Sequence, residues 1–127
     1  MVNIQHRVMI VDDDIIMHDV LKMMLQPKYE LRLCFHVQQA REVLEHWMPE
    51  VICVDLMMPG ENGLSLLSYA KNTPAIEHIP FIVISASSDD MFFNEARRLG
   101  AHSLVFKPFS RIDLIRAIDS ALEGPDA

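Results

Sequence analysis

The amino-acid sequence predicts an α/β domain built on a parallel, doubly wound sheet. Short apolar segments alternate five times with segments whose apolar residues recur at helical spacing. Two of the short segments, residues 51–54 and 81–84, contain only apolar side chains, which is typical of parallel strands buried on both faces. Because parallel neighbours need crossover connections, the helices should cover both faces of the sheet.

The first three strands are short segments, of which the first and third are apolar runs that stop at acidic residues. Residues 7–11 end at three consecutive acids, which a buried strand could not contain. Residues 30–34 alternate polar and apolar side chains, and residues 51–54 end at Asp55. Asp14 is placed to cap the helix that follows the first strand. The apolar positions of the two intervening helices are Met17, Val20, Leu21, Met24 and Leu25, closed by Pro27, and Ala40, Val43, Leu44 and Trp47, closed by Pro49.

The second half of the chain repeats this alternation. A third helix is marked before Pro74, and a fourth ends at Gly100, a residue well suited to a helix C-terminus. Between them lies the strand 81–84, and the last strand is expected at 104–106. Ser110 and Asp113 resemble an N-terminal capping arrangement. The apolar positions of the third helix are Leu64, Leu67 and Ala70, and those of the fourth are Phe92, Ala96 and Leu99. Those of the fifth helix are Ile112, Ile115, Ala117, Ile118 and Leu122.

The composition favours one globular domain. Half of the 127 residues are apolar and 23% are charged, an ordinary balance for a domain with its own core. We expect a single domain over residues 1–127, with its core at about 6–123 and a tail or the start of a linker at 124–127. Cys34 and Cys53 should be buried free thiols, and the six histidines should be surface or packing residues.

Several classes of function are disfavoured. No apolar run approaches the roughly 20 residues that cross a bilayer, and no segment resembles a secretion signal. We therefore expect a cytoplasmic protein without membrane contact. The net charge of −7 argues against direct nucleic acid binding by this segment, because affinity for phosphate backbones comes mainly from clustered Lys and Arg.

Polar residues gather at the predicted carboxyl ends of the strands, where doubly wound sheets bind ligands. These residues are Asp12, Asp13, Asp55, Ser85 and Lys107. Neighbouring carboxylates repel one another unless a divalent cation lies among them, and hard oxygen ligands favour Mg²⁺. An ammonium and a hydroxyl beside them suit a phosphoryl group. One carboxylate could then be the nucleophile while the others hold the metal.

These motifs, in this order and spacing, resemble the receiver domain of two-component response regulators, the family that includes the chemotaxis receivers. The residues that carry the resemblance are Val11 to Asp14, Val54 to Pro59 with Gly63, Ser85 with Ala86, and Lys107 to Phe109. The resemblance covers nearly the whole chain. It implies a flavodoxin-like topology of five parallel strands in the order 2-1-3-4-5 with five helices.

The resemblance also implies a metal site. Asp55 would be the phosphoacceptor that attacks the phosphohistidine of a sensor histidine kinase or a phosphotransfer protein. Asp13 and Asp55 would coordinate Mg²⁺ directly, together with the backbone carbonyl of Met57, while Asp12 would hold the metal through water. The domain would catalyse only its own phosphorylation and slow self-dephosphorylation.

Other residues would bind and report the phosphoryl group. Lys107 would pair with the phosphoryl oxygens. The Lys107–Pro108 peptide bond would be cis, which would help to hold the lysine over the pocket. Ser85 would move toward the phosphoryl group, and the small Ala86 would leave it room. One position departs from the family pattern, because Leu104 stands where receivers often carry an aromatic residue that swings inward. Phe106 faces the same side as Leu104.

The output surface is expected on the fourth helix, fifth strand and fifth helix. There an apolar face could bind an effector or form a homodimer, with a response that depends mainly on Ser85 and the loop after it. Its expected members are Phe92, Phe93, Leu104 and Phe106.

Two other functions fit parts of the pattern. A haloacid-dehalogenase-like phosphatase also has an Asp nucleophile in a DxD pattern, here Asp12 and Asp14, but it needs a further acidic pair after its lysine. Beyond Lys107, only Asp113 and Asp119 remain on one helix. A pseudo-receiver would use the same fold without phosphorylation, and such domains normally lack the acids or the lysine.

Overall fold

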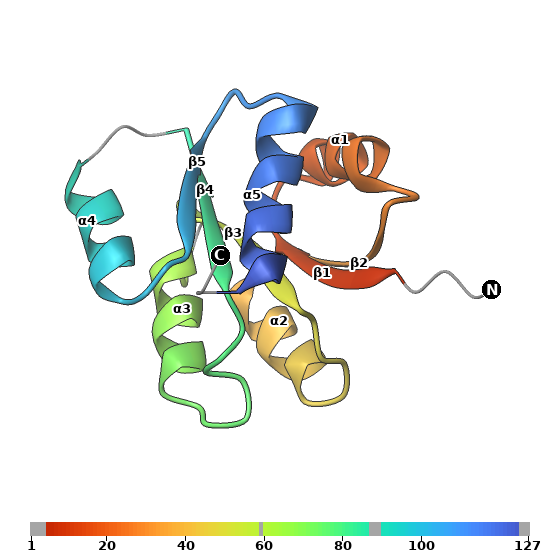
Figure 1. Cartoon of the computed structure of the whole chain (residues 1–127). Coiled ribbons are helices and arrows are strands. Elements are labelled where there is room, and N and C mark those ends of the chain that lie inside the picture. The colour runs from red at the N-terminus through yellow and green to blue at the C-terminus, as the bar shows by residue number, and fades with distance from the viewer. Residues whose placement is uncertain (1–4, 59, 87–89, 125–127) are drawn as a thin grey trace.

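The structure, a computed structural model, describes residues 5–58, 60–86 and 90–124 (Figure 1). Some predicted features lie outside the described residues. They are Pro59 of the resemblance motif, residues 87–89 of the loop after Ser85, and residues 125–127 of the expected tail. In the part of the chain that is described, no helix has the length and apolar character needed to cross a membrane.

Five parallel strands form one sheet in the order β2-β1-β3-β4-β5, and five helices cover it. The predicted fold class and strand order are therefore confirmed. The strands are β1 His6–Val11, β2 Tyr29–Cys34, β3 Val51–Asp55, β4 Phe81–Ser85 and β5 Ser103–Phe106. The helices are α1 Ile15–Leu25, α2 Val37–Leu44, α3 Gly63–Lys71, α4 Asp90–Arg98 and α5 Arg111–Glu123.

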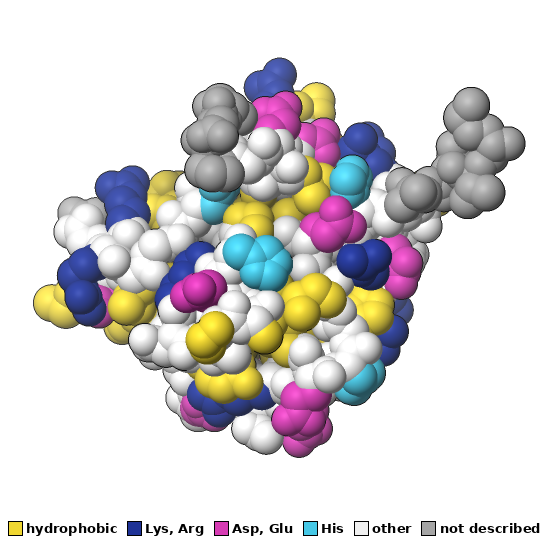
Figure 2. All heavy atoms as spheres, turned by 60° about the horizontal axis from the view of Figure 1, so that its bottom comes forward, with side chains coloured by type: hydrophobic (Ala, Val, Ile, Leu, Met, Phe, Trp, Pro, Cys, Tyr) yellow, Lys and Arg dark blue, Asp and Glu magenta, His cyan; other side chains and the backbone are white. Residues whose placement is uncertain are grey.

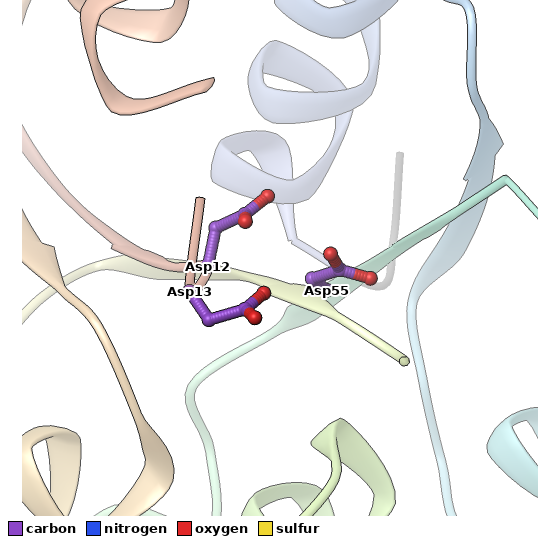
Figure 3. Close-up of side chains that lie close together, drawn as sticks. All are labelled: Asp12, Asp13 and Asp55. Carbon is purple, nitrogen blue, oxygen red and sulfur yellow. The ribbon is translucent and has the colours of Figure 1, made fainter. Parts of the chain in front are cut away.

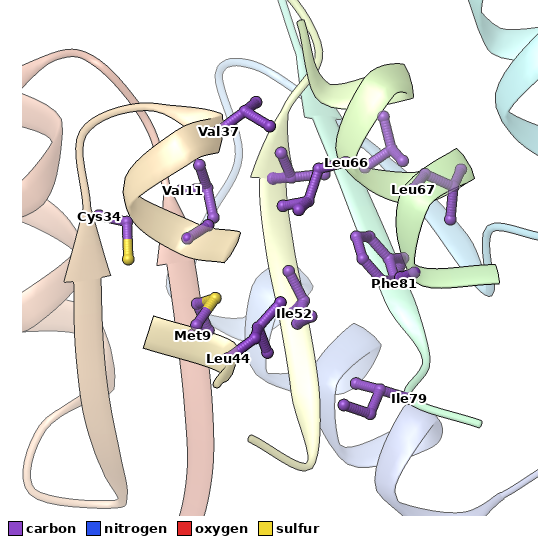
Figure 4. Packing of buried hydrophobic residues seen from close by; sticks show 14 of the residues in the cluster. Met9, Val11, Cys34, Val37, Leu44, Ile52, Leu66, Leu67, Ile79 and Phe81 are labelled. Carbon is purple, nitrogen blue, oxygen red and sulfur yellow. The ribbon is translucent and has the colours of Figure 1, made fainter. Parts of the chain in front are cut away.

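The sheet separates two hydrophobic clusters, and β3 contributes to both. Helices α2 and α3 lie on one side of the sheet, and α1 and α5 lie on the other (Figure 1). Ile52 and Val54 point toward α2 and α3, in the cluster shown in Figure 4, whereas Val51 and Cys53 point toward α1 and α5. Successive side chains of a strand face opposite sides. A strand covered on both faces therefore needs an apolar residue at every position.

Local capping explains where the helices begin. The Asp14 carboxylate accepts hydrogen bonds from the backbone N–H groups of Ile16 and Met17, at 2.9 and 3.4 Å. Ser110 and Asp113 form a reciprocal capping box at the start of α5. Both caps were predicted from the sequence, and each is typically worth about 1 kcal/mol of helix stability.

The predicted apolar face of α5 was wrong at one position. Ile112 is 60% exposed, because it lies in the first turn on the side away from the sheet. The buried residues of α5 are Leu114, Ile118 and Ala121, whose i, i+4 and i+7 spacing is that of a single helical stripe. Leu114 and Ala121 were absent from the predicted set.

The two cysteines are buried and free, as predicted. Cys34 ends β2 and Cys53 lies in β3, and β1 runs between these two strands. Burial raises the pKa of the Cys34 thiol to about 11 and that of Cys53 to about 12. Both thiols therefore stay protonated at neutral pH, and we treat them as packing residues.

The surface at the opposite end of the sheet from the strand carboxyl ends carries mixed charges. Figure 2 shows this side, with positive, negative and histidine side chains interspersed among scattered hydrophobic ones. Chemically related side chains gather instead at the carboxyl edge.

Candidate functional site

The carboxyl ends of β1 and β3 bring three carboxylates together. Asp12 and Asp13 follow β1 directly, and Asp55 is the last residue of the neighbouring β3. Figure 3 shows the three side chains gathered at this edge. One oxygen from each lies within 4.8 Å of the others. Asp12 and Asp55 are 3% and 7% exposed, whereas Asp13 is open to solvent.

Lys107 supplies the positive charge of this cluster. It follows β5, and its Nζ atom lies 3.1 Å from Oδ2 of Asp55 and 3.4 Å from Oδ2 of Asp12. The Lys107–Pro108 peptide bond is cis, as predicted. Burial disfavours the lysine charge, but the Asp55 and Asp12 carboxylates outweigh this effect and raise the pKa of Lys107. The ammonium is therefore charged at neutral pH.

Asp55 has a raised pKa despite its contact with Lys107. Burial is the main cause, and the nearby charge of Asp12 adds to it. Lys107 and the N–H group of Met57, which donates to Oδ1 of Asp55 at 3.0 Å, act in the opposite direction. One lysine therefore does not compensate this group of carboxylates, and the cluster has an excess of negative charge that a cation would neutralise.

The structure brings Ser85 and Ala86 to the same edge. Ser85 ends β4, between β3 and β5, and is fully buried. The exposed Ala86 lines an open pocket of about 400 Å³ beside Lys107. The other lining residues come from α1 and from the segment after β5, and are Met17, Val20, Met24, Pro108 and Phe109. Lys107 is thus shared between this pocket and the acidic cluster.

The loop that carries Asp12 is held by hydrogen bonds on several sides. The Asp12 N–H donates to the carbonyl of Cys34 at 3.0 Å, and Oδ1 of Asp12 accepts from the N–H of Asp14 at 2.9 Å. Nε2 of His18 lies 2.6 Å from the carbonyl oxygen of Asp12. The sequence placed His18 only among surface or packing residues. His18 lies three residues before Leu21 and seven before Leu25, the other buried residues of α1. This helical spacing could have indicated that His18 faces the interior.

Gly63 permits a close approach between α3 and β3. A Cβ atom on Gly63 would lie 2.7 Å from the carbonyl oxygen of Asp55 and 3.1 Å from Cγ2 of Val54. The Gly63 N–H donates to the carbonyl of Leu56 at 3.2 Å. Any side chain here would press on the backbone of the residue that carries the buried carboxylate.

An ion pair that the sequence did not predict connects α2 to the loop after β3. The Arg41 guanidinium donates to both carboxylate oxygens of Glu61, at 2.9 and 2.7 Å, and also to the hydroxyl of Ser65 at 3.2 Å. It lies over the ring of Tyr69 at 5.1 Å. Hydrogen bonds from Ser65 and Arg41 lower the pKa of Glu61. The loop that follows Asp55 is therefore attached to a neighbouring helix.

The expected output face is only partly at the surface. Phe106 is 52% exposed, and its ring is tilted against Phe93 with centroids 4.6 Å apart. Phe93 is itself buried, at 4% exposed, because Phe106 covers it. Leu104 is partly buried and packs against the cluster on the α2 and α3 side. The exposed apolar surface here is thus narrower than the four predicted residues suggested.

These observations define a class of protein: a doubly wound α/β domain with an acidic, lysine-containing site at the carboxyl edge of its sheet. Comparison with known proteins narrows the class. The model of the "Response regulator receiver domain" family matches residues 8–119. This chain belongs to the response regulator receiver family. Membership decides against the haloacid-dehalogenase-like alternative.

One relative and two solved structures illustrate the similarity. The phosphate regulon transcriptional regulatory protein PhoB of Pseudomonas aeruginosa is 28% identical over 121 residues, covering 93% of this chain and 53% of PhoB. The chain thus spans about half the length of that relative. A CheY-like receiver domain from Methanospirillum hungatei superposes with a TM-score of 0.87 at 22% identity, covering 94% and 95% of the two chains. The chemotaxis response regulator CheY4 of Vibrio cholerae superposes with a TM-score of 0.86 at 21% identity, covering 94% of this chain and 100% of CheY4. At these identities the two structures support the fold alone.

Proposed function

We propose that this chain is a Mg²⁺-dependent phosphoacceptor, with Asp55 as the residue that receives the phosphoryl group from a sensor histidine kinase or a phosphotransfer protein. The observation that carries the proposal is the contact of Lys107 with both Asp55 and Asp12 inside a cluster of three carboxylates. A lysine beside a buried nucleophile neutralises the charge that an incoming phosphoryl group brings.

The donor set fits Mg²⁺. Carboxylate oxygens are the hard ligands that this cation prefers, and it usually keeps several waters and shares its shell with phosphate. Asp13 and Asp55 would hold it directly, Asp12 would hold it through water, and the backbone carbonyl of Met57 would be the third protein ligand. When bound, the cation supplies neutralisation of the phosphoryl oxygens. The solvent-exposed position of Asp13 supports entry of a hydrated ion.

The protein groups around Asp55 would orient its carboxylate and the incoming phosphoryl group. The Met57 N–H group holds Oδ1 of Asp55 at 3.0 Å and fixes the plane of the carboxylate. In the transfer, a carboxylate oxygen forms a bond to phosphorus while the bond from phosphorus to the donor imidazole nitrogen breaks, and the imidazole keeps the electron pair. Lys107 would then pair with the phosphoryl oxygens. The domain would act once per phosphoryl group and hydrolyse its acyl phosphate slowly, without turnover of a separate substrate.

The phosphorylated state would be read through Ser85 and the surface of α4, β5 and α5. A change in binding requires contacts that differ between the two states. Ser85 lies beside β3 and β5 and can supply such a contact, whereas Leu104 has no hydroxyl and no ring. The exposed Phe106 would contact an effector or a second copy of the domain.

The test is labelling by a small phosphodonor. With acetyl phosphate and Mg²⁺, intact-mass spectrometry should detect one added phosphoryl group, and Asp55→Asn or chelation of the metal should abolish it. An amide cannot act as the carboxylate nucleophile. Asp14→Asn is the matched control, because Asp14 is a nearby acid whose capping role asparagine can take over, and it should label normally. Labelling that survives in Asp55→Asn would contradict the proposal, because another residue would then be the acceptor. A wild type that is not labelled would contradict it as well and would favour a pseudo-receiver.

A further inference from the structure

His18 contacts the peptide group that joins the two acids of the β1–α1 loop. The side chain is 3% exposed, and Nε2 lies 2.6 Å from the backbone carbonyl oxygen of Asp12. A carbonyl oxygen can only accept a hydrogen bond, so Nε2 carries the hydrogen and donates it. The carbonyl of Asp12 and the N–H of Asp13 belong to one planar peptide group. His18 therefore fixes the orientation of the peptide from which Asp13 projects.

The imidazole is itself held in place from two directions. Its ring stacks on Phe35, with centroids 4.2 Å apart and an angle of 24° between the planes. The Phe35 N–H donates to Oε1 of Gln39 at 2.7 Å, which ties this residue to α2. The backbone N–H of His18 donates to the carbonyl of Asp14 at 3.1 Å, which holds the base of the side chain inside the capped first turn of α1. The donor thus reaches Asp12 from a rigid helix.

Rigid support matters because the acids repel one another. With three carboxylates within 4.8 Å, a metal-free loop would lower its electrostatic energy by turning Asp13 away from Asp12 and Asp55. The hydrogen bond from His18 opposes this rotation at the peptide where it would occur. A metal ligand that is already oriented loses less freedom when the ion binds.

We propose that His18 is a positioning residue that orients Asp13 for Mg²⁺. This inference rests on the proposed function, since it assigns to His18 the support of the same metal site. His18 touches neither the cation nor the phosphoryl group, and it acts through the Asp12–Asp13 peptide.

Two variants separate the hydrogen bond from the packing. His18→Phe keeps an aromatic ring to stack on Phe35 but has no donor, whereas His18→Gln places an amide N–H at a reach similar to that of Nε2. Mg²⁺ alone is titrated into each protein at one fixed pH, with binding followed by calorimetry. The Mg²⁺ dissociation constant should rise about tenfold in His18→Phe, as for other supporting residues of metal ligands, and it should return most of the way to the wild-type value in His18→Gln.

A second measurement needs no metal. The amide ¹⁵N chemical shift of Asp13 reports the hydrogen bond to the carbonyl of its own peptide group, so it should move in metal-free His18→Phe and return in His18→Gln. His102→Phe is the matched control, because it removes another histidine hydrogen bond, the one between Nε2 and the Ser120 hydroxyl at 3.3 Å, directly before the start of β5 and thus at the other end of the sheet from the acids. It should leave both the Mg²⁺ affinity and the Asp13 shift unchanged.

The inference is overturned if His18→Phe lowers the melting temperature but binds Mg²⁺ as tightly as the wild type, since His18 would then be only structural. If His18→Phe does not fold, His18→Asn replaces it, because its amide is too short to reach Asp12 and should weaken Mg²⁺ binding relative to His18→Gln. A wild type that binds no Mg²⁺ refutes the proposed function. An unchanged Asp13 shift in the metal-free variants refutes the role of His18 independently of that result.

Discussion

Nζ of Lys107 lies 3.1 Å from Oδ2 of Asp55, although the two residues are 52 positions apart and their strands, β5 and β3, are separated in the sheet by β4. The lysine thus reaches across the end of a strand to a nearly buried carboxylate. The pKa of Asp55 is nevertheless raised, because burial and the charge of Asp12 outweigh the lysine. The ionised carboxylate of Asp55 therefore works against the stability of the metal-free fold.

The first prediction is that Asp55→Asn stabilises the metal-free protein at neutral pH. A carboxyl group whose pKa is raised in the folded state favours folding while it is protonated, and this contribution is lost as the pH rises through the folded-state pKa. Asparagine has no charge to lose. We expect the melting temperature of Asp55→Asn to exceed that of the wild type by about 4 °C at pH 7, measured by calorimetry in a chelator.

The pH and metal dependence provide the control for this effect. Below the ordinary pKa of an aspartate, both proteins are uncharged at position 55, so the difference between their melting temperatures should vanish. Saturating Mg²⁺ should raise the melting temperature of the wild type more than that of Asp55→Asn, because a ligand stabilises the state that binds it. A difference that stays constant from acid to neutral pH would show that the ionisation of Asp55 is not its cause.

The second prediction concerns the contact between Gly63 and the backbone of Asp55. In Gly63→Ala the new Cβ would lie 2.7 Å from the Asp55 carbonyl oxygen, so α3 or the end of β3 must shift. We expect a loss of about 1–3 kcal/mol in the free energy of unfolding, the usual range for overpacking, together with slower labelling by acetyl phosphate.

Gly60→Ala is the matched control for Gly63→Ala. Gly60 has a φ of +76°, and a Cβ there would meet nothing within 4 Å. Alanine should destabilise the protein by about 1 kcal/mol through backbone strain without moving Asp55. Equal labelling rates in the two variants would mean that the close approach of Gly63 does not control the position of Asp55.

The third prediction is that Arg41 limits the motion of the loop after β3. Arg41→Lys keeps the positive charge but cannot form the two-pronged contact with Glu61. Amide hydrogen exchange of residues 60–62 should become severalfold faster, and Glu61→Gln, which removes the charge of the acceptor, should have a similar effect. High salt should accelerate exchange in the wild type, because ions screen an exposed pair. Exchange that is unchanged in both variants would show that the loop is held by other contacts.

The fourth prediction separates the switch from the output surface. Self-association or partner affinity is measured with and without beryllium fluoride as a phosphoryl mimic, in the presence of Mg²⁺. Ser85→Ala should abolish most of the response, since it removes the hydroxyl that we propose contacts the phosphoryl group, whereas Leu104→Ala should mainly weaken binding in both states. Phe106→Ala should weaken binding without changing the ratio between the states. The opposite pattern for Ser85 and Leu104 would identify Leu104 as the switch.

Much of the fold was predictable because it depends on neighbours in the chain. Strand alternation and breaker residues located all ten elements, and parallel pairing then required Asp12, Asp55 and Lys107 to meet at one edge. The capping roles of Asp14 and Ser110 were equally accessible, since a cap bonds to backbone groups two or three residues away. These are local interactions, and residue type and spacing are sufficient to indicate them.

Tertiary structure decided the contacts that join distant segments. The stacking of His18 on Phe35, the pairing of Arg41 with Glu61, and the approach of α3 to Asp55 at Gly63 all connect residues on different elements. The exposure of Ile112 likewise follows from the rotation of α5 against the sheet. Such contacts depend on how the elements pack at a scale of a few ångströms, and the periodicity of apolar residues does not specify packing at that scale. The sequence by itself determined which residues meet at the carboxyl edge, whereas only the packing of helices against the sheet decided which side chains hold them there.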